Sequence, residues 1–132
     1  MESVEEFLDG KNILIVDDDA RNTFAISSYL EGIGMNTHVA ENGFEAIDFL
    51  ADNPAIEIIL MDMMMPEMDG YEAIEKIKNN RNTSAIPIIA VTAKAMKGDR
   101  EKCLATGASE YVSKPVDTNE LLEKMVYVIN RK

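Results

Sequence analysis

Five short apolar runs are spaced along the chain, and longer stretches of mixed apolar and polar residues separate them. In those stretches the apolar residues return every three or four positions, which is the period of an amphipathic helix. Strands that alternate with helices predict βαβ units and a mostly parallel sheet covered on both faces. The predicted strands are residues 13–16, 35–40, 56–61, 86–91 and 109–112.

The domain organisation follows from length and composition. A chain of 132 residues suits one domain. Residues 1–10 are predicted to be an N-terminal tail or a remnant of a linker, with Gly10 as the turn into the first strand. Residues 11–132 contain no repeat, low-complexity tract or linker, and they are predicted to form the whole domain.

Charge and residue counts exclude several classes of protein. The 24 acidic and 13 basic residues give a net charge of -11, which argues against direct binding to nucleic acid. Cys103 and His38 are the only residues of their types, which excludes an internal disulfide and any site with two imidazoles. No apolar stretch approaches the ~18 residues of a membrane span, and the N-terminus lacks the order of a signal peptide. We therefore expect a cytoplasmic protein without direct membrane contact.

Reactive side chains follow four of the five predicted strands. In open parallel sheets ligands bind beyond the carboxyl ends of the strands, so these side chains are expected at one edge. They are Asp17, Asp18 and Asp19 after the first strand, Asp62 after the third, Thr92 after the fourth and Lys114 after the fifth.

This combination of side chains indicates phosphate chemistry with a metal. Carboxylates ~4 Å apart repel by about 4 kcal/mol at an effective dielectric near 20, so the cluster calls for a cation. Carboxylates, water and a phosphate are the ligands typical of Mg²⁺. An aspartate can also accept a phosphoryl group. Each residue alone would be an ordinary turn or cap residue, and the prediction depends on all four strand ends together.

The chain resembles the response-regulator receiver domains of two-component systems. The resemblance spans residues 11–130 and includes the motifs ILIVDDD, MDMMMPEMDG and VTA and the pair Lys114-Pro115. It implies a single doubly wound α/β sheet of five parallel strands, in the order 2-1-3-4-5 and flanked by five helices, which is a flavodoxin-like fold. The stretches GKNILIVDDDARN and KPVDTNELL look most like receivers of hybrid histidine kinases.

The resemblance also implies a role for each acid. Asp62 corresponds to the phosphoacceptor, and Asp17 with Asp18 to the acid pair. Asp18 and Asp62 would bind Mg²⁺ directly and Asp17 through water, and the backbone carbonyl of Met64 would complete the protein ligands. Asp19 is an additional acid, which we assign to the cap of the following helix.

Further roles are implied for five residues at the edge of this site. Thr92 and Lys114 would contact the phosphoryl oxygens, and Tyr111 matches an aromatic switch position that moves with Thr92. The Lys114-Pro115 bond resembles a cis peptide of the family. Met64 and Lys94 flank the path of the hydrolytic water, and neither is suited to orient it. We therefore expect slow loss of the phosphoryl group.

The implied function is transfer of a phosphoryl group from a phosphohistidine to Asp62, which switches the surface around the last two strands and helices. The donor would be a histidine kinase or a histidine phosphotransfer protein. Such a receiver catalyses its own phosphorylation and slow dephosphorylation, and it is not an enzyme with a separate substrate. A homodimer on activation is left open, as is the choice between a stand-alone protein and part of a larger one.

Three alternatives remain at this stage. A haloacid-dehalogenase-type phosphatase would use Asp17 as nucleophile and Asp19 as acid/base, but it would leave Asp62 without a role. A flavin-binding module of the same topology would need a phosphate loop rich in Ser and Thr after the first strand, where this chain has acids. A degenerate receiver that only binds partners would not require every active position to be filled.

Overall fold

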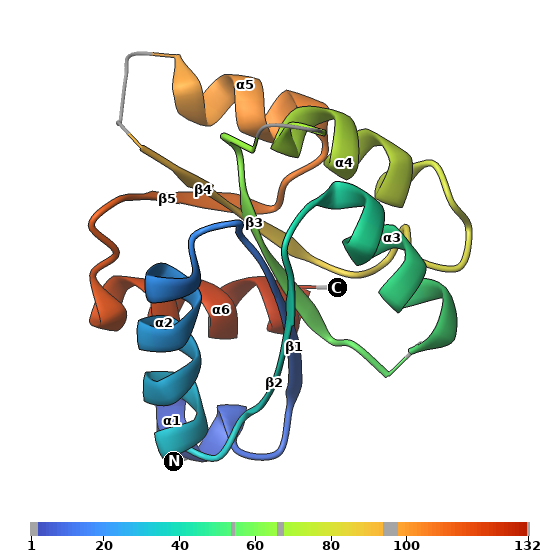
Figure 1. Ribbon diagram of the computed structural model, residues 1–132. Coiled ribbons are helices and arrows are strands. Elements are labelled where there is room, and N and C mark those ends of the chain that lie inside the picture. The colour runs from blue at the N-terminus through green and yellow to red at the C-terminus, as the bar shows by residue number, and fades with distance from the viewer. Residues whose placement is uncertain (1–2, 54, 66–67, 94–97, 132) are drawn as a thin grey trace.

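The computed structural model describes residues 3–53, 55–65, 68–93 and 98–131. These residues contain one sheet of parallel strands in the order β2-β1-β3-β4-β5 (Figure 1). The predicted class, strand order and strand positions are confirmed, with bounds that differ by at most two residues. The strands are β1 (Asn12–Val16), β2 (Asn36–Ala40), β3 (Ile58–Asp62), β4 (Ile88–Thr92) and β5 (Glu110–Ser113).

Side chains of the central strands point alternately to two apolar layers. On β1, Ile13 and Ile15 pack into one layer, whereas Leu14 and Val16 pack into the other. Both layers are shielded from water, because parallel strands with helices on each side are buried on both faces. This explains why the central strands are nearly continuous apolar runs in the sequence.

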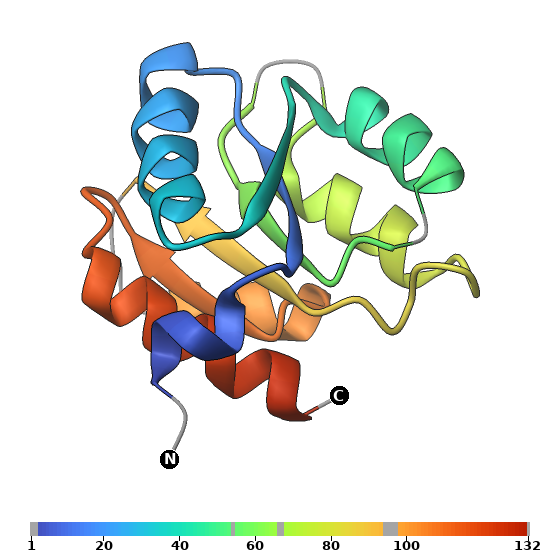
Figure 2. The same cartoon turned by 90° about the horizontal axis from the view of Figure 1, so that it is seen from below.

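The helices divide between the two faces of the sheet, as Figure 2 shows from below. One face is covered by α1, α2 and α6, and the other by α3, α4 and α5. The helices are α1 (Val4–Leu8), α2 (Ala20–Gly32), α3 (Gly43–Asp52), α4 (Gly70–Lys78), α5 (Asp99–Thr106) and α6 (Thr118–Arg131).

The first helix lies within residues 1–10, the segment predicted to be a tail. The described residues contain six helices, one more than expected, and the additional one is α1 within the predicted tail. Ser3 caps it, because its hydroxyl accepts a hydrogen bond from the Glu6 N–H over 3.1 Å. Leu8 is fully buried in the layer that contains α6. Residues 4–8 are therefore packed on the domain, beside α6 (Figure 2).

Candidate functional site

Three aspartates meet at the carboxyl edge of the sheet. Asp17 and Asp18 directly follow β1, and Asp62 is the last residue of β3. One carboxylate oxygen of each residue lies within 4.8 Å of the others. Asp17 and Asp62 are buried, with 5% and 2% of their surface exposed, whereas Asp18 is exposed. The expected convergence of the acids is confirmed.

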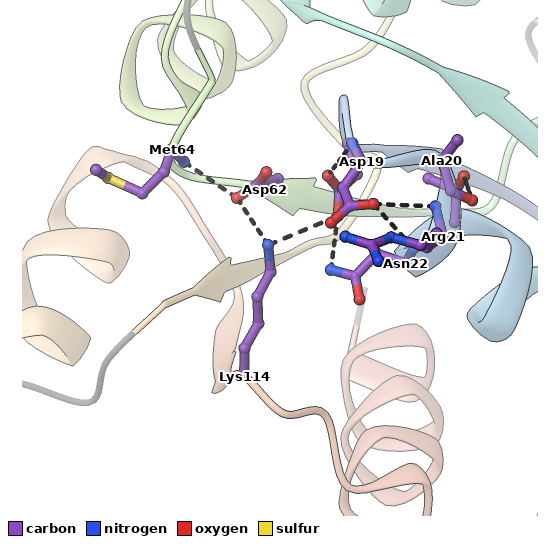
Figure 3. Close-up of polar contacts among 9 residues, drawn as sticks. Asp19, Ala20, Arg21, Asn22, Asp62, Met64 and Lys114 are labelled. Atoms are coloured by element: carbon purple, nitrogen blue, oxygen red, sulfur yellow. Dashed lines mark hydrogen bonds and ion pairs between the residues drawn. The ribbon is translucent and has the colours of Figure 1, made fainter.

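Lys114 bridges the two buried acids. Its Nζ lies 3.7 Å from Asp17 Oδ2 and 3.7 Å from Asp62 Oδ1. Figure 3 shows the side chain extending toward Asp62. The Lys114-Pro115 peptide bond is cis, as expected. The backbone N–H of Lys114 donates to the Thr92 carbonyl over 2.8 Å, so the lysine is held beside the end of β4.

Hydrogen bonds fix both buried carboxylates. Asp17 Oδ1 accepts from the Asp19 N–H over 2.9 Å, and Asp17 Oδ2 accepts from Asn22 Nδ2 over 3.2 Å. Asp62 Oδ1 accepts from the Met64 N–H over 3.1 Å. Asn22 was not predicted as a site residue, because a lone asparagine in a helix has no distinctive sequence signal.

Asp19 has a different task from its two neighbours. Its Oδ1 accepts hydrogen bonds from the N–H groups of Arg21 and Asn22, over 3.0 Å and 3.5 Å. A carboxylate in this position accepts hydrogen bonds from free N–H groups at the start of a helix. Its negative charge also interacts favourably with the positive end of the helix dipole. The predicted cap of α2 is confirmed (Figure 3).

A close approach of backbone sets the turn after Asp62. The Gly70 N–H donates to the Met63 carbonyl over 3.3 Å. A Cβ at Gly70 would lie 2.6 Å from the Met63 Cα and 2.7 Å from the Asp62 carbonyl oxygen. Glycine therefore allows α4 to start directly against the end of β3, next to the acid cluster.

Asp62 binds its proton more tightly than an ordinary aspartate. Burial raises the pKa of Asp62 to about 6, although the hydrogen bond from the Met64 N–H lowers it. The Asp17 carboxylate raises this pKa and the Lys114 ammonium lowers it. A cation bound beside Asp62 would favour the ionised form further.

Three of the remaining predicted site residues lie in the part of the chain that the structure describes. Thr92 ends β4 and is buried, and Tyr111 lies half-buried on β5 against the layer of α3, α4 and α5. The side chain of Met64 is 70% exposed. Lys94 lies outside the described residues. The roles of these residues in transfer, switching and phosphoryl lifetime stay predictions.

The donor set fits a divalent cation. Three carboxylates supply hard oxygen ligands, and their oxygens lie within 4.8 Å of one another. Lys114 offsets part of this charge, and the rest favours a cation such as Mg²⁺, which keeps several waters and binds through one or two carboxylates and phosphate oxygens. Asp17, Asp18 and Asp62 are the side chains that would hold it.

A cavity of about 700 Å³ opens beside Asp18. The cavity lies between Asp18, the end of β3, the start of α4 and part of α5. The lining residues are Asp18, Met63, Met64, Met65, Asp69, Tyr71 and Lys102.

Comparison with curated proteins gives one consistent family. Residues 13–126 match the family model of the response regulator receiver domain. The chain is 41% identical over 119 residues to the probable transcriptional regulator ycf29 of Pyropia yezoensis, covering 90% of this chain and 53% of that protein. It is 38% identical over 113 residues to the polar-differentiation response regulator DivK of Brucella anthropi, covering 86% and 91%. It spans little more than half the length of several curated relatives.

Solved structures agree with this result. The receiver domain of a sensor histidine kinase from Pseudomonas aeruginosa, with a magnesium ion coordinated in its active site cleft, is 35% identical with a TM-score of 0.83. The match covers 92% of this chain and 98% of that one. The receiver domain of Ssk1, crystallised with the Saccharomyces cerevisiae histidine phosphotransfer protein Ypd1, is 27% identical with a TM-score of 0.82. That match covers 90% of this chain and 88% of that one.

A doubly wound sheet with clustered acids and a bridging lysine at its carboxyl edge defines a flavodoxin-like protein whose acid cluster fits a divalent cation. The chain belongs to the response regulator receiver domain family, which serves two-component systems. This membership decides against the phosphatase and flavin alternatives. In the part of the chain that the structure describes, no helix has the length and apolarity needed to cross a bilayer.

Proposed function

We propose that Asp62 accepts a phosphoryl group from a phosphohistidine, and that Asp17, Asp18, Thr92 and Lys114 support the transfer. The observation that carries the proposal is the position of Lys114, whose ammonium lies 3.7 Å from both the Asp17 and the Asp62 carboxylates. An ammonium in this place can contact an oxygen of a phosphoryl group joined to Asp62.

The transfer requires little covalent chemistry from the protein. An oxygen of the Asp62 carboxylate attacks phosphorus, the P–N bond breaks, and its electron pair stays on the imidazole nitrogen. The Lys114 ammonium and the Thr92 hydroxyl donate hydrogen bonds to phosphoryl oxygens, whose charge must be balanced during transfer. Mg²⁺ held by Asp17, Asp18 and Asp62, with the Met64 carbonyl, would neutralise charge on the same oxygens.

The partner is proposed to be a histidine kinase or a histidine phosphotransfer protein. A matching receiver crystallised with the phosphotransfer protein Ypd1 supports this, as does 37% identity over 109 residues to the signal transduction histidine-protein kinase BarA of Escherichia coli. That match covers 83% of this chain and 12% of BarA. The excess of acidic residues supports a protein partner and not a nucleic acid. A cytoplasmic location is part of the same proposal. A homodimer on activation is compatible with this assignment.

The proposed output is a change of the surface formed by β4, β5, α5 and α6. The backbone N–H of Lys114 donates to the Thr92 carbonyl. The lysine whose ammonium would contact the phosphoryl group therefore also connects the ends of β4 and β5. Movement of Thr92 toward the phosphoryl group would change the space available to Tyr111 on the neighbouring strand. Phosphorylation would in this way bias a two-state surface.

Loss of the phosphoryl group is proposed to be slow and catalysed by the protein itself. Water must approach the phosphorus from the solvent side, where Met64 is 70% exposed and has no group that orients water. Lys94, predicted to flank the same path, would pair with the phosphoryl group. A long lifetime suits a relay or a lasting signal.

Phosphorylation by acetyl phosphate with Mg²⁺ tests the assignment. The wild type should gain one phosphoryl group, detected by intact-protein mass spectrometry and removed by base or hydroxylamine. Asp62→Asn should gain none, whereas Asp48→Asn, a change of an exposed acid on α3, should behave as the wild type. Full labelling of Asp62→Asn would move the acceptor elsewhere, with Asp17 the next candidate.

A further inference from the structure

Asn22 connects α2 to the acid cluster. It is the third residue of α2 and half-buried, and its Nδ2 donates to Asp17 Oδ2 over 3.2 Å. No other side-chain amide among the described residues donates to one of the three clustered aspartates.

Three hydrogen bonds hold Asp17, in addition to its ion pair with Lys114. Its backbone N–H donates to the Ala40 carbonyl over 3.0 Å, which fixes its main chain beside β2. Its Oδ1 accepts from the Asp19 N–H over 2.9 Å, and its Oδ2 accepts from Asn22. Each oxygen therefore has a neutral donor, and the plane of the carboxylate is fixed. Asp18, in contrast, is exposed and makes no hydrogen bond or ion pair with another described residue.

The donor is itself held in place. The backbone N–H of Asn22 lies 3.5 Å from Asp19 Oδ1, the cap of α2. Asn22 thus binds one acid through its main chain and another through its side chain. The start of α2 and the Asp17 carboxylate are consequently positioned relative to each other.

The chemistry of an amide suits this position. A lysine or arginine here would add positive charge beside Asp17 and compete with a metal ion for its oxygens. An acid would add repulsion to a cluster that already holds three carboxylates. A neutral donor orients the carboxylate and leaves its charge available to a cation.

We propose that Asn22 is a positioning residue of the metal site, which orients Asp17 for a divalent cation. The inference rests on the proposed function, since it requires that the acid cluster binds Mg²⁺. Groups that orient metal ligands from outside the ligand set commonly change metal affinity by about 10–100-fold. Asp17 keeps two other contacts, to Asp19 and Lys114, so the lower end of that range is expected.

Titration with Mg²⁺ alone, followed by calorimetry at constant ionic strength, tests the proposal. Asn22→Ala should bind Mg²⁺ about tenfold more weakly than the wild type. The thermal midpoint of the metal-free protein should be unchanged or slightly higher, because alanine is the strongest helix former. Asn22→Leu, which removes the donor but keeps the branched shape of the side chain, should weaken Mg²⁺ binding to the same extent. Phosphorylation by acetyl phosphate should slow at low Mg²⁺ and reach the wild-type rate at saturating Mg²⁺.

Asn119→Ala is the matched control, since Asn119 is exposed in the first turn of α6. It should leave Mg²⁺ affinity unchanged. Equal Mg²⁺ affinity in Asn22→Ala and the wild type would overturn the proposal, and so would an equal loss in Asn119→Ala. A wild type that binds no Mg²⁺ would instead contradict the metal site of the proposed function.

Discussion

Lys124 on α6 holds the backbone of Tyr111 on β5, because its Nζ donates to the Tyr111 carbonyl over 2.6 Å. The same ammonium lies 5.3 Å from the centroid of the Tyr111 ring. It also pairs with Glu120 Oε2 at 3.4 Å and Glu110 Oε1 at 4.0 Å. The residue proposed to switch is therefore tied to α6 in the unphosphorylated protein.

Replacing Lys124 should loosen Tyr111. Lys124→Met keeps an apolar stem but removes the donor, and it should lower the free energy of unfolding by about 1–2 kcal/mol. Amide hydrogen exchange of residues 111–113 should become faster. Lys102→Met is the control, because the Lys102 ammonium lies 4.4 Å from the Tyr71 ring centroid but donates to no backbone carbonyl among the described residues. Unchanged exchange at residues 111–113 in Lys124→Met would contradict the restraint.

Removing one acid from the cluster should stabilise the metal-free protein. Asp18→Asn reduces repulsion with Asp17 and Asp62 and should raise the thermal midpoint by a few degrees, for a gain of about 1 kcal/mol. Mg²⁺ should stabilise the wild type, as any ligand of the native state does, and should stabilise Asp18→Asn less. Glu123→Gln on α6 makes the same charge change on an exposed surface and should have neither effect. A wild-type melting curve that Mg²⁺ does not move would contradict the metal site.

The raised pKa of Asp62 predicts a stability that falls as pH rises. Below pH 4 the group is protonated in both folded and unfolded chains. Between pH 4 and about 6 Asp62 is ionised in the unfolded chain but still protonated in the folded one, so the free energy of unfolding falls as pH rises. The total loss above pH 6 is on the order of 1–3 kcal/mol. In the presence of a chelator, Asp62→Asn should therefore gain stability over the wild type across this window, measured by urea unfolding. A difference that is constant with pH would show that Asp62 titrates normally.

The exposed side chain of Met64 should lengthen the life of the phosphorylated form. Met64→Asn supplies an amide that can orient water, and it should shorten the half-life several-fold, measured by the decay of labelled protein. Combining it with Lys94→Glu should shorten the half-life further. Met64→Leu keeps an apolar group and should decay as the wild type does. An unchanged half-life in the double variant would show that these side chains do not govern the approach of water.

Leu8 should contribute to stability as a core residue does. Leu8→Ala removes a fully buried side chain and should cost about 2–4 kcal/mol, measured by chemical unfolding. Glu5→Ala, an exposed change on the same helix, should stay within about 0.5 kcal/mol of the wild type. Equal stabilities for the two variants would show that residues 4–8 contribute nothing to the core and behave as a tail.

The sequence predicted the sheet because its central strands are buried on both faces and read as continuous apolar runs. It also predicted the convergence of Asp17, Asp62 and Lys114, since parallel strands place their carboxyl ends at one edge. The strand order came from the family resemblance, because apolar periodicity carries no information on which strands are neighbours.

Two features escaped prediction for physical reasons. Helix α1 has five residues and two acids in its first turn, so its apolar residues are too few to show a period. It forms because Leu8 is buried by tertiary packing, which local sequence does not reveal. Asn22 is a common surface residue type, and only the fold shows that its amide reaches Asp17.

The site at the carboxyl edge draws its groups from nearly the whole chain, from Asp17 after β1 to Lys114 after β5. No hairpin or single βαβ unit contains both the acids and the lysine. During synthesis Asp62 is made before the lysine that lies beside it, and the two meet only when β5 has paired with β4. A nascent or truncated chain that ends before residue 114 lacks this ammonium, so the proposed phosphoryl acceptance would require that folding has reached the last strand.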